Sequence, residues 1–442
     1  MATVVEHKKF SKTDLQNNNN KYWNVTLYDN GDVMSEWGRQ GKTKQSKTWT
    51  GAGRSFMESK IREKNKKGYF ENEVVEGTGE IKISANKVAN TELKDIATKQ
   101  IKSKNPVVAK LVQFLVDVNA HAIHKATGGK IVYDTSSATF KTTQGVVLPS
   151  QVTRARDLLA TMYDYVKKGN YDPIKDELNE YLSLIPRDFG MKRVSPADIL
   201  PDTMAIGKEN DILDSLATAY ADVQTATKKT TQKKTTKKTA PKIFDVQMEI
   251  VKDPKVLSHV KHLYQSTRKS MHQSNNLSVQ TVYAVSIKTM KDRFDKKGAA
   301  MKNVWQLWHG TKASNLLSIL KGGLIIPSSS AAHCTGRMYG DGVYFSDIST
   351  KALNYATNYW GGGGRTDRTF MFLADVAMGN YHIAQSSWDR YPKHGTDSTW
   401  AKGRDKGGVN SGVINDEMIV YSLDQCNLVY LVEFVSRSQY RG

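Results

Sequence analysis

Cysteine is almost absent from this chain of 442 residues, which contains only Cys334 and Cys426. Two cysteines form no disulfide framework, and neither belongs to the Cys-x-x-Cys pattern that is typical of zinc sites. Long apolar runs are also missing, since no stretch approaches the ~18 residues of a membrane-spanning helix. The opening residues, MATVVEHKKF, lack the apolar core of a secretory signal. We therefore expect a soluble protein of a reducing compartment.

Acidic residues are in short supply as well. The chain has 44 Asp plus Glu against 64 Lys plus Arg, which leaves a formal net charge of +20. This surplus favours a polyanionic partner, and nucleic acid is the preferred interpretation, although some basic chains bind nothing in particular. The length favours about three domains, each able to bury its own core.

Residues 1–76 have the pattern of a small β domain. Apolar and polar residues alternate from 23 to 27, and the Asp-Asn-Gly of 29–31 is a turn signal before the next strand. That strand leads into the triplet Trp37-Gly38-Arg39, and a basic amphipathic helix is expected after it.

Residues 77–104 predict a linker, and residues 105–225 predict an all-helical unit. Asn105 is the expected N-cap of the first helix, with proline in the next position. Apolar residues recur at helical spacing in four runs, at 107–118, 152–166, 178–185 and 212–220. His121 and His124 lie one turn apart, but no third metal ligand accompanies them, so a surface or core role is preferred.

Residues 226–242 carry seven lysines and no apolar residue larger than alanine. Such a segment buries no core and is expected to be a disordered basic tether. A solvated spacer is preferred over a nuclear-import signal or an added attraction for phosphate.

From residue 243 to the end, strand patterns outnumber helix patterns, which suits an α+β fold around a split antiparallel sheet. The stretch 336–355 predicts a glycine-rich turn, a strand at 343–345, and a helix with Asp347 as its N-cap. Tyr344 and Tyr355 would then flank one strand-to-helix corner. Two aromatic faces could sandwich a flat cationic ring by stacking and cation–π attraction. The alternative is that both tyrosines are half-buried core residues.

Three motifs, in this order, resemble the donor site of the poly(ADP-ribose) polymerases. They are LWHGTKASN at 307–315, GVYF at 342–345 with a tyrosine at 355, and NDEMIVY at 415–421. The Trp-Gly-Arg triplet resembles the WGR domain, and LIPRDFGMK at 184–192 resembles the helical regulatory domain of DNA-dependent members. The resemblance implies a multidomain α+β protein. Its parts would be a WGR DNA-binding domain (1–76), the linker (77–104), an all-α regulatory bundle (105–225), the tether (226–242) and an α+β ADP-ribosyltransferase catalytic domain (243–442).

The resemblance also implies site residues. Glu417 would hold the ribose 2′-hydroxyl, steady positive charge and polarise the acceptor hydroxyl. Tyr355 would stack on nicotinamide and Tyr344 would close the other side. The backbone of Gly310 would bind the carboxamide, and His309 the adenosine ribose. Further NAD+ and acceptor positions are Thr311 and Asn315 at the adenosine end, Lys351 and Ala352 in the pocket, and Met338 on the acceptor side.

By the same resemblance, Trp37, Arg39, Asn20 and Tyr69 would bind DNA. Arg39 would reach a terminal phosphate and Trp37 would pack on a terminal sugar or base, in keeping with the bidentate geometry of arginine and the stacking of aromatic rings. The alternative places Trp37 in the small β core and leaves Arg39 solvated.

The leading hypothesis is therefore a DNA-break-activated poly(ADP-ribosyl)transferase. NAD+ is its expected substrate and no metal is expected. Expected partners are DNA breaks or ends and acceptor proteins, including the chain itself; an accessory factor is left open, and no membrane partner is expected. The location would be nuclear in a eukaryote and cytoplasmic otherwise. The alternatives are a mono-ADP-ribosyltransferase and a catalytically silent DNA-end-binding scaffold.

One departure from the family pattern generates a prediction. Ala352 stands where poly-forming members have a serine that donates a hydrogen bond to the nicotinamide carboxamide. Ala352→Ser should add one hydrogen bond, worth about 1 kcal/mol, so NAD+ and benzamide-like inhibitors should bind the variant more tightly. Calorimetric titration of both proteins measures this, and equal affinities would refute the alignment or the role.

Overall fold

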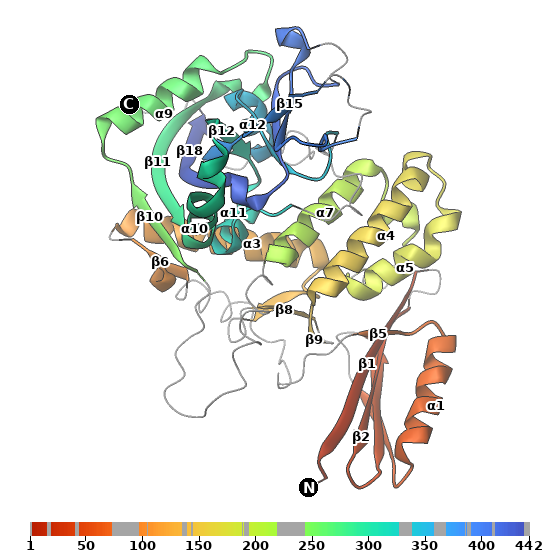
Figure 1. Ribbon diagram of the computed structural model, residues 1–442. Helices are drawn as coiled ribbons and strands as arrows, with labels where there is room; N and C mark the ends of the chain where they lie inside the picture. Colours follow the sequence, from red (N-terminus) through yellow and green to blue (C-terminus); the bar gives the residue numbers. More distant parts are fainter. Residues whose placement is uncertain are drawn as a thin grey trace. The chain divides into compact units, whose positions relative to one another are not determined.

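The computed structural model describes residues 2–15, 19–39, 44–72, 97–103, 105–134, 139–142, 145–187, 189, 194–218, 244–326, 338–357, 368–384, 386, 390–408 and 412–436. They form two compact units, one from residues 1–89 and 121–220 and the other from residues 90–120 and 221–442. Figure 1 labels their helices and strands. The predicted tether, most of the predicted linker, Gly336 and part of the LIPRDFGMK motif lie outside the described residues.

The first unit opens with a five-stranded antiparallel sheet in the order β4-β3-β2-β1-β5. Its strands are β1 (Val4–Asp14), β2 (Asn19–Tyr28), β3 (Val33–Arg39), β4 (Gln45–Trp49) and β5 (Phe70–Asn72). Helix α1 (Gly53–Lys66) contributes buried Met57 to the core of this sheet. Trp23, Val25 and Leu27 all lie in that core, which confirms the strand predicted from their alternation.

The predicted helices follow in the same unit. They are α4 (Pro149–Lys167), α5 (Lys175–Leu184), the short α6 (Pro196–Ile199) and α7 (Thr203–Thr218). The all-helical prediction is nevertheless incomplete, because a small antiparallel sheet precedes them. Its strands are β7 (Val132–Asp134), β8 (Thr139–Thr142) and β9 (Gly145–Val146). Strands of two to four residues are too short to show an alternating pattern.

The second unit contains two sheets, which confirms the α+β fold with a split sheet. The sheets are mostly but not purely antiparallel, because each contains one parallel pair of strands. The six-stranded sheet has the order β12-β14-β18-β11-β10-β6, and the four-stranded sheet has the order β13-β17-β16-β15. The strands of the larger sheet are β6 (Ile101–Lys102), β10 (Val246–Ile250), β11 (Leu277–Ile287), β12 (Val304–Gly310), β14 (Thr369–Ala377) and β18 (Cys426–Ser436). Those of the smaller sheet are β13 (Val343–Phe345), β15 (Tyr381–Ile383), β16 (Ser398–Ala401) and β17 (Glu417–Val420).

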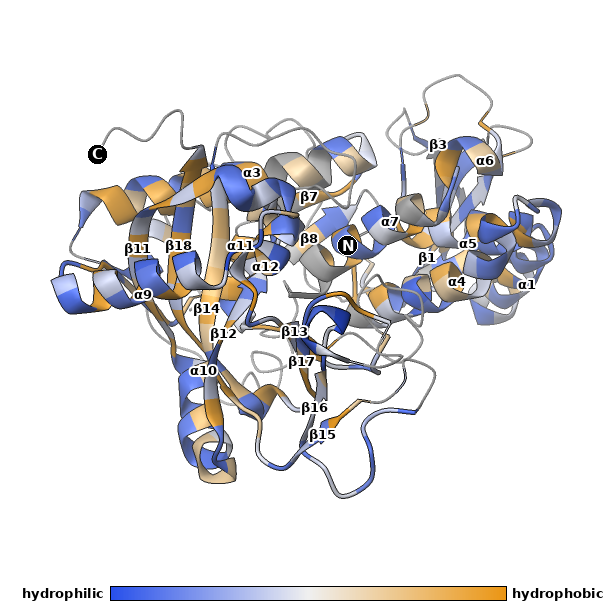
Figure 2. Cartoon of the chain, turned by 90° about the horizontal axis from the view of Figure 1, so that it is seen from above, coloured by the Kyte–Doolittle hydropathy of each residue, from blue (hydrophilic) through white to orange (hydrophobic). Residues whose placement is uncertain are grey.

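Helices α9 (Pro254–Ser266) and α12 (Ser349–Ala356) pack against the larger sheet. Tyr264 of α9 and Leu353 of α12 are buried together with Trp308, Leu373 and Phe434. Hydrophobic residues gather on the central strands β14 and β18 (Figure 2). The remaining helices of this unit include α10 (Lys288–Arg293) and α11 (Ala313–Gly322).

One isolated bridge joins the two sheets. The amide of Trp308 donates to the carbonyl of Ser346 at 2.9 Å, and the amide of Ser346 donates back at 3.0 Å. The end of β12 is thereby fixed beside the end of β13. These two strand ends carry His309, Gly310 and Tyr344.

Helix α3 (Pro106–Thr127) begins as predicted, because the Asn105 side chain accepts a hydrogen bond from the Val107 amide at 2.9 Å. Its residues up to 120 belong to the second unit and the rest to the first. Phe114 lies beside Phe370 of β14 with 6.1 Å between ring centroids. The first half of α3 therefore packs on the larger sheet.

A buried ion pair connects the helices of the first unit. Arg187, which belongs to the LIPRDFGMK motif, is only 6% exposed and pairs with Glu209 of α7. Its guanidinium also donates to the carbonyl of Ala126 near the end of α3. Tyr181 of α5 donates to the same Glu209 carboxylate at 2.5 Å. Three helices thus meet at one pair of charges.

We predict that Arg187→Met lowers the local stability of this unit by about 3–5 kcal/mol, because Glu209 would stay buried without its cation. Arg154→Met is the matched control, since Arg154 forms an exposed pair with Glu180 whose loss should cost about 0–1 kcal/mol. Hydrogen exchange of the α5 and α7 amides in the full chain measures both. Equal losses of stability in the two variants would contradict the view that the buried ion pair contributes more than the exposed one.

Candidate active site and nucleic-acid interface

His309 occupies the end of β12 and is bonded to β13. Its Nδ1 lies 3.0 Å from the carbonyl oxygen of Tyr344. Because a carbonyl only accepts, the hydrogen belongs on Nδ1, and Nε2 is left as an acceptor in the neutral ring. Burial lowers the pKa of His309, so the ring is neutral near pH 7. A neutral acceptor here suits a hydroxyl group, such as that of a ribose.

Gly310 lies against helix α12. A Cβ built on Gly310 would overlap the carbonyl oxygen of Ala352, so the two main chains approach too closely for any side chain. Ala352 is 4% exposed and belongs to the same buried cluster as Trp308 and Leu353. The backbone at the end of β12 is therefore tightly positioned against α12.

The hydroxyl of Tyr344 is fixed by its own chain. It donates to the Gly340 carbonyl at 2.9 Å and accepts from the Tyr339 amide at 2.9 Å. Its ring packs on the buried cluster that includes Tyr339 and Ile419. The ring orientation is thus determined before any ligand binds.

Helix α12 begins at Ser349 with Ile348 as its N-cap, so the prediction that Asp347 caps this helix is wrong. The Ser346 hydroxyl accepts the Ile348 amide hydrogen at 3.1 Å instead. The Asp347 carboxylate binds the Lys406 ammonium at 2.6 Å, which draws it away from the helix end.

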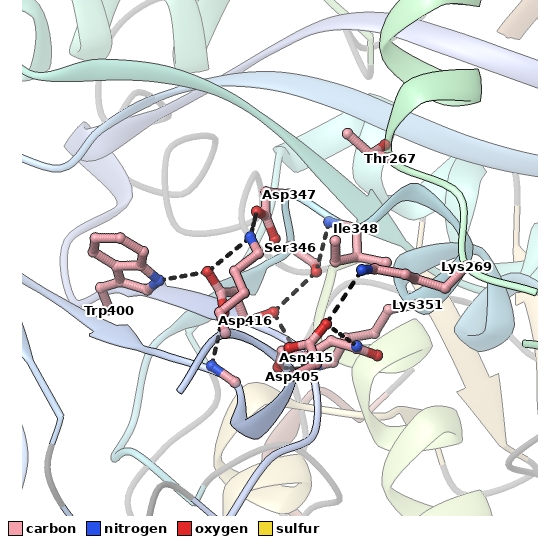
Figure 3. A network of polar contacts seen from close by, with 12 residues as sticks. Thr267, Lys269, Ser346, Asp347, Ile348, Lys351, Trp400, Asp405, Asn415 and Asp416 are labelled. Carbon is pink, nitrogen blue, oxygen red and sulfur yellow. Dashed lines mark hydrogen bonds and ion pairs between the residues drawn. The ribbon is translucent and has the colours of Figure 1, made fainter. Parts of the chain in front are cut away.

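Glu417 opens β17 and is 8% exposed. Its Oε1 lies 2.8 Å from the Nζ of Lys351 on α12. The same ammonium donates to the carbonyls of Asn415 at 2.7 Å and Asp416 at 3.3 Å. Figure 3 shows Lys351 directed toward these residues. Lys351, predicted as a pocket-lining residue, therefore fixes the chain on both sides of Asp416 and forms an ion pair with Glu417.

Tyr355 lies one helical turn after Lys351 and is 37% exposed. Partial burial and the negative charge of Glu417 raise the pKa of the Tyr355 hydroxyl. The charge of Glu417 is thus felt by Tyr355, the residue that was predicted to stack on nicotinamide.

The structure therefore brings most of the predicted pocket residues into one region. Strand β12, strand β13, helix α12 and the start of β17 supply them. Asn315, at the start of α11, donates to the Thr311 hydroxyl at 3.2 Å, so these two predicted residues form a contiguous pair. Met338 is 44% exposed.

The sequence analysis missed the importance of Asp416, which is fully buried although it is charged. Asp416 belongs to the NDEMIVY motif, but no role was predicted for it. Two consecutive acids at the start of an apolar strand were a usable signal, because alternation places one of them on the buried side.

Two predicted DNA-binding residues, Trp37 and Arg39, lie on β3, which is placed between β4 and β2 in the first sheet. Trp37 stands opposite Trp23 and packs, partly buried, on the core, in keeping with the alternative role that the sequence left open. Arg39 stands opposite Lys21. Asn20 donates to the Arg187 carbonyl at 3.3 Å, so its amide makes a contact within the first unit.

Tyr69 belongs to a basic and aromatic cluster that sequence reasoning missed. The Nζ of Lys64 lies 5.1 Å from the ring centroid of Tyr69 and 5.5 Å from that of Trp23. Burial lowers the pKa of Lys64, the charges of Lys67, Lys60 and Lys21 lower it further, and the charge of Glu63 opposes them. Several cations and two rings therefore converge at the end of α1, and the spacing of lysines in that helix was the available signal.

No group of three or more histidine, cysteine or acidic side chains within the described ranges could hold a metal ion. Among those same residues, no helix combines the length and the apolarity needed to cross a membrane.

Gly310→Ala tests the close approach of β12 and α12. The added methyl group must displace the Ala352 carbonyl, so we expect a loss of stability of at least about 1–3 kcal/mol. Urea unfolding followed by tryptophan fluorescence, with Trp308 buried nearby, measures the effect. Unchanged stability would show that the two main chains are not in contact.

Three family models match this chain in sequence. They are the WGR domain at residues 7–76, the poly(ADP-ribose) polymerase regulatory domain at 105–247 and the poly(ADP-ribose) polymerase catalytic domain at 254–436. Among similar proteins, poly [ADP-ribose] polymerase 2 of Homo sapiens is 24% identical over 84% of this chain and 64% of its own length. Poly [ADP-ribose] polymerase of Drosophila melanogaster is 24% identical over 97% of this chain and 46% of its own length.

The chain spans less than two thirds of the length of these relatives. The order of the three matches is nevertheless the order in which the motifs were found, and together the matches extend over most of the sequence. Because the regulatory and catalytic matches adjoin and follow a WGR match, this chain belongs to the poly(ADP-ribose) polymerase family.

Proposed function

We propose that this chain is an NAD+-dependent ADP-ribosyltransferase that builds poly(ADP-ribose) on itself and on other proteins. The observation that carries the proposal is the pairing of Glu417 with Lys351, beside Tyr355. The same region contains a neutral His309 and the bare backbone of Gly310. A charge, an aromatic face and a hydroxyl acceptor are groups that suit a nicotinamide riboside unit.

The chemistry follows from the charges. The bond between ribose C1′ and the nicotinamide nitrogen breaks, and its electron pair leaves with neutral nicotinamide, so no strong acid is needed. The sugar becomes oxocarbenium-like, as in glycoside hydrolysis. The Glu417 carboxylate would stabilise this positive charge and orient the ribose 2′-hydroxyl. The acceptor oxygen then bonds to C1′, and its proton passes to the Glu417 carboxylate and from there to solvent.

Polymer formation is proposed in preference to a single transfer. Elongation requires that the acceptor be a ribose hydroxyl of the growing chain, and Glu417 can accept a hydrogen bond from it while it faces the donor sugar. His309, Tyr344 and Glu417 form the set that accompanies elongation in the family. A single transfer is the alternative outcome of the test below.

We propose further that DNA breaks activate the enzyme through the first unit. Lys64 and its neighbouring lysines provide positive charge beside two aromatic rings, which suits phosphate and an unstacked base. Strand β1 is bonded to α5, because the Thr13 amide donates to the Ser183 hydroxyl at 3.0 Å. A DNA end bound to the sheet would therefore act on the helical region.

Helix α3 provides the corresponding contact at the pocket. Its Asn119 donates to the Ser314 carbonyl at 2.6 Å, next to Asn315 at the proposed adenosine end. Movement of α3 would change the start of α11. This contact supports a regulatory role for the helical region.

The test uses labelled NAD+ with and without nicked duplex DNA, and compares the wild type with Glu417→Gln. The variant keeps the shape of the side chain and loses its charge, so nicotinamide release should fall about 10²–10³-fold. Glu249→Gln, which changes an exposed glutamate of β10, is the matched control and should retain activity.

The products separate the hypotheses. A ladder of labelled species that intensifies with DNA supports a DNA-activated polymerase, and one discrete adduct supports a single transfer. No label at all would leave a DNA-end-binding scaffold. Equal labelling with and without DNA would overturn the regulatory proposal alone.

A further inference from the structure

On the side of β17 that faces β13, backbone pairing stops before the first residue of β17. Side-chain contacts hold the start of the strand there instead. Strand β13 pairs with β17 only as far as Phe345 opposite Met418. Beyond that pair, the Ser346 hydroxyl donates to the Asp416 carbonyl at 3.0 Å. Glu417 therefore sits at a strand end whose position depends on the residues just before it.

Asp416 is fully buried, and its carboxylate is nevertheless completely engaged. It accepts hydrogen bonds from the Trp400 indole at 2.8 Å, the Gly403 amide at 2.7 Å and the Lys406 ammonium at 3.2 Å. Figure 3 shows the Trp400 indole nitrogen directed at Asp416. A buried carboxylate is costly unless such donors satisfy it, so these contacts define its place sharply.

Lys406 also reaches the other strand. Its ammonium lies 2.6 Å from an Asp347 oxygen, and Asp347 is the second residue after β13. One cation therefore bridges a carboxylate beyond β13 and a carboxylate before β17. We define this Asp347–Lys406–Asp416 arrangement as the lysine bridge.

The backbone at Gly403 is packed closely against the segment that precedes Glu417. A Cβ on Gly403 would overlap the Ile414 carbonyl and approach the Asn415 Cα to 2.6 Å. Asp405 accepts from the Asn415 amide at 2.9 Å and pairs with Lys269 at 3.4 Å. Residues 402–408 thus enclose the segment that leads to Glu417.

Trp400 is itself held rigidly. Its ring forms edge contacts with Trp305 and Tyr381, at centroid separations of 5.6 and 5.8 Å. The donor that anchors Asp416 therefore belongs to a cluster of three packed aromatic rings.

We propose that Asp416, held by the lysine bridge, is a positioning residue for ADP-ribosyl transfer; this inference rests on the proposed function. The Asp416 carboxylate contacts Trp400, Gly403 and Lys406, whereas its carbonyl accepts from Lys351. Fixing Asp416 therefore fixes the chain beneath Glu417 and one of the three acceptors of the Lys351 ammonium. Small displacements of a charge-stabilising group can reduce the rate greatly while substrate contacts elsewhere remain.

The experiment replaces Lys406 in the full chain, because its side chain is 37% exposed and the buried Asp416 carboxylate would keep the Trp400 and Gly403 donors. Lys406→Met removes the bridging charge, and we expect kcat for nicotinamide release to fall about 10–100-fold. The KM for NAD+ should stay near the wild-type value, since Gly310 and Tyr355 are untouched. Lys406→Arg preserves the bridging charge and should restore most of kcat.

Lys402→Met is the matched control. It removes one positive charge from the same loop, and the described residues include no hydrogen bond or ion pair for that ammonium. Its kcat should match the wild type. Asp416→Asn is a second probe. It keeps the volume of the side chain but replaces one accepting oxygen with an NH2 group, which would face the donors that now bind the carboxylate.

A double-mutant cycle with Glu417→Gln separates positioning from a general structural effect. If Asp416 and Lys406 act through Glu417, Lys406→Met should cost little further activity once Glu417 is replaced. A full additional loss in that background, an equal loss in Lys402→Met, or an unchanged kcat in Lys406→Met would each overturn the proposal. A wild type without transfer activity would overturn the proposed function first, and the positioning role with it.

Discussion

The ammonium of Lys351 is the contact on which the pocket depends. A lysine has three hydrogen-bond donors, and here the acceptors within reach are two main-chain carbonyls and the Glu417 carboxylate. A carboxylate with 8% exposure is unfavourable without a cation, and the cation is equally unfavourable without its acceptors. Helix α12 and strand β17 are thereby locked together at the point where a substrate sugar would lie.

The two sheets of the second unit provide the frame for this contact. The bridge between Trp308 and Ser346 brings the end of β12 to the end of β13, and the missing side chain of Gly310 lets α12 approach the same place. Each segment contributes one kind of group, and none could form the pocket alone. Rigid backbone contacts at every corner reduce the reorganisation needed when charge develops.

In the first unit, the role of a positively charged side chain depends on how deeply it is buried. Arg187 is enclosed and shared between a carboxylate and a carbonyl, so it joins helices. Lys64 is partly covered by two rings and surrounded by other lysines, which leaves a site where an anion would relieve the repulsion. A basic surplus in the composition thus divides into cations that stabilise the fold and cations suited to a polyanion.

Local pattern in the sequence was sufficient for many of the regular elements, but not for all of them. Alternation predicted the strand through Trp23, and the Asn105 cap predicted the start of α3, because both follow from neighbouring residues alone. The three short strands β7 to β9 carried too few residues to show a period. Asp347 was assigned to the wrong partner, because its cation, Lys406, is distant in sequence.

For the site, the sequence by itself determined which residue types are present and, through the family resemblance, which of them matter. Only the tertiary structure decided that Lys351 pairs with Glu417, that Asp416 is buried beneath it, and that His309 bears its hydrogen on Nδ1. A sequence motif shows which types of side chain are present and at which positions in the chain they lie. Partners, burial and protonation arise only when separate strands meet, because each depends on the atoms that folding brings into contact.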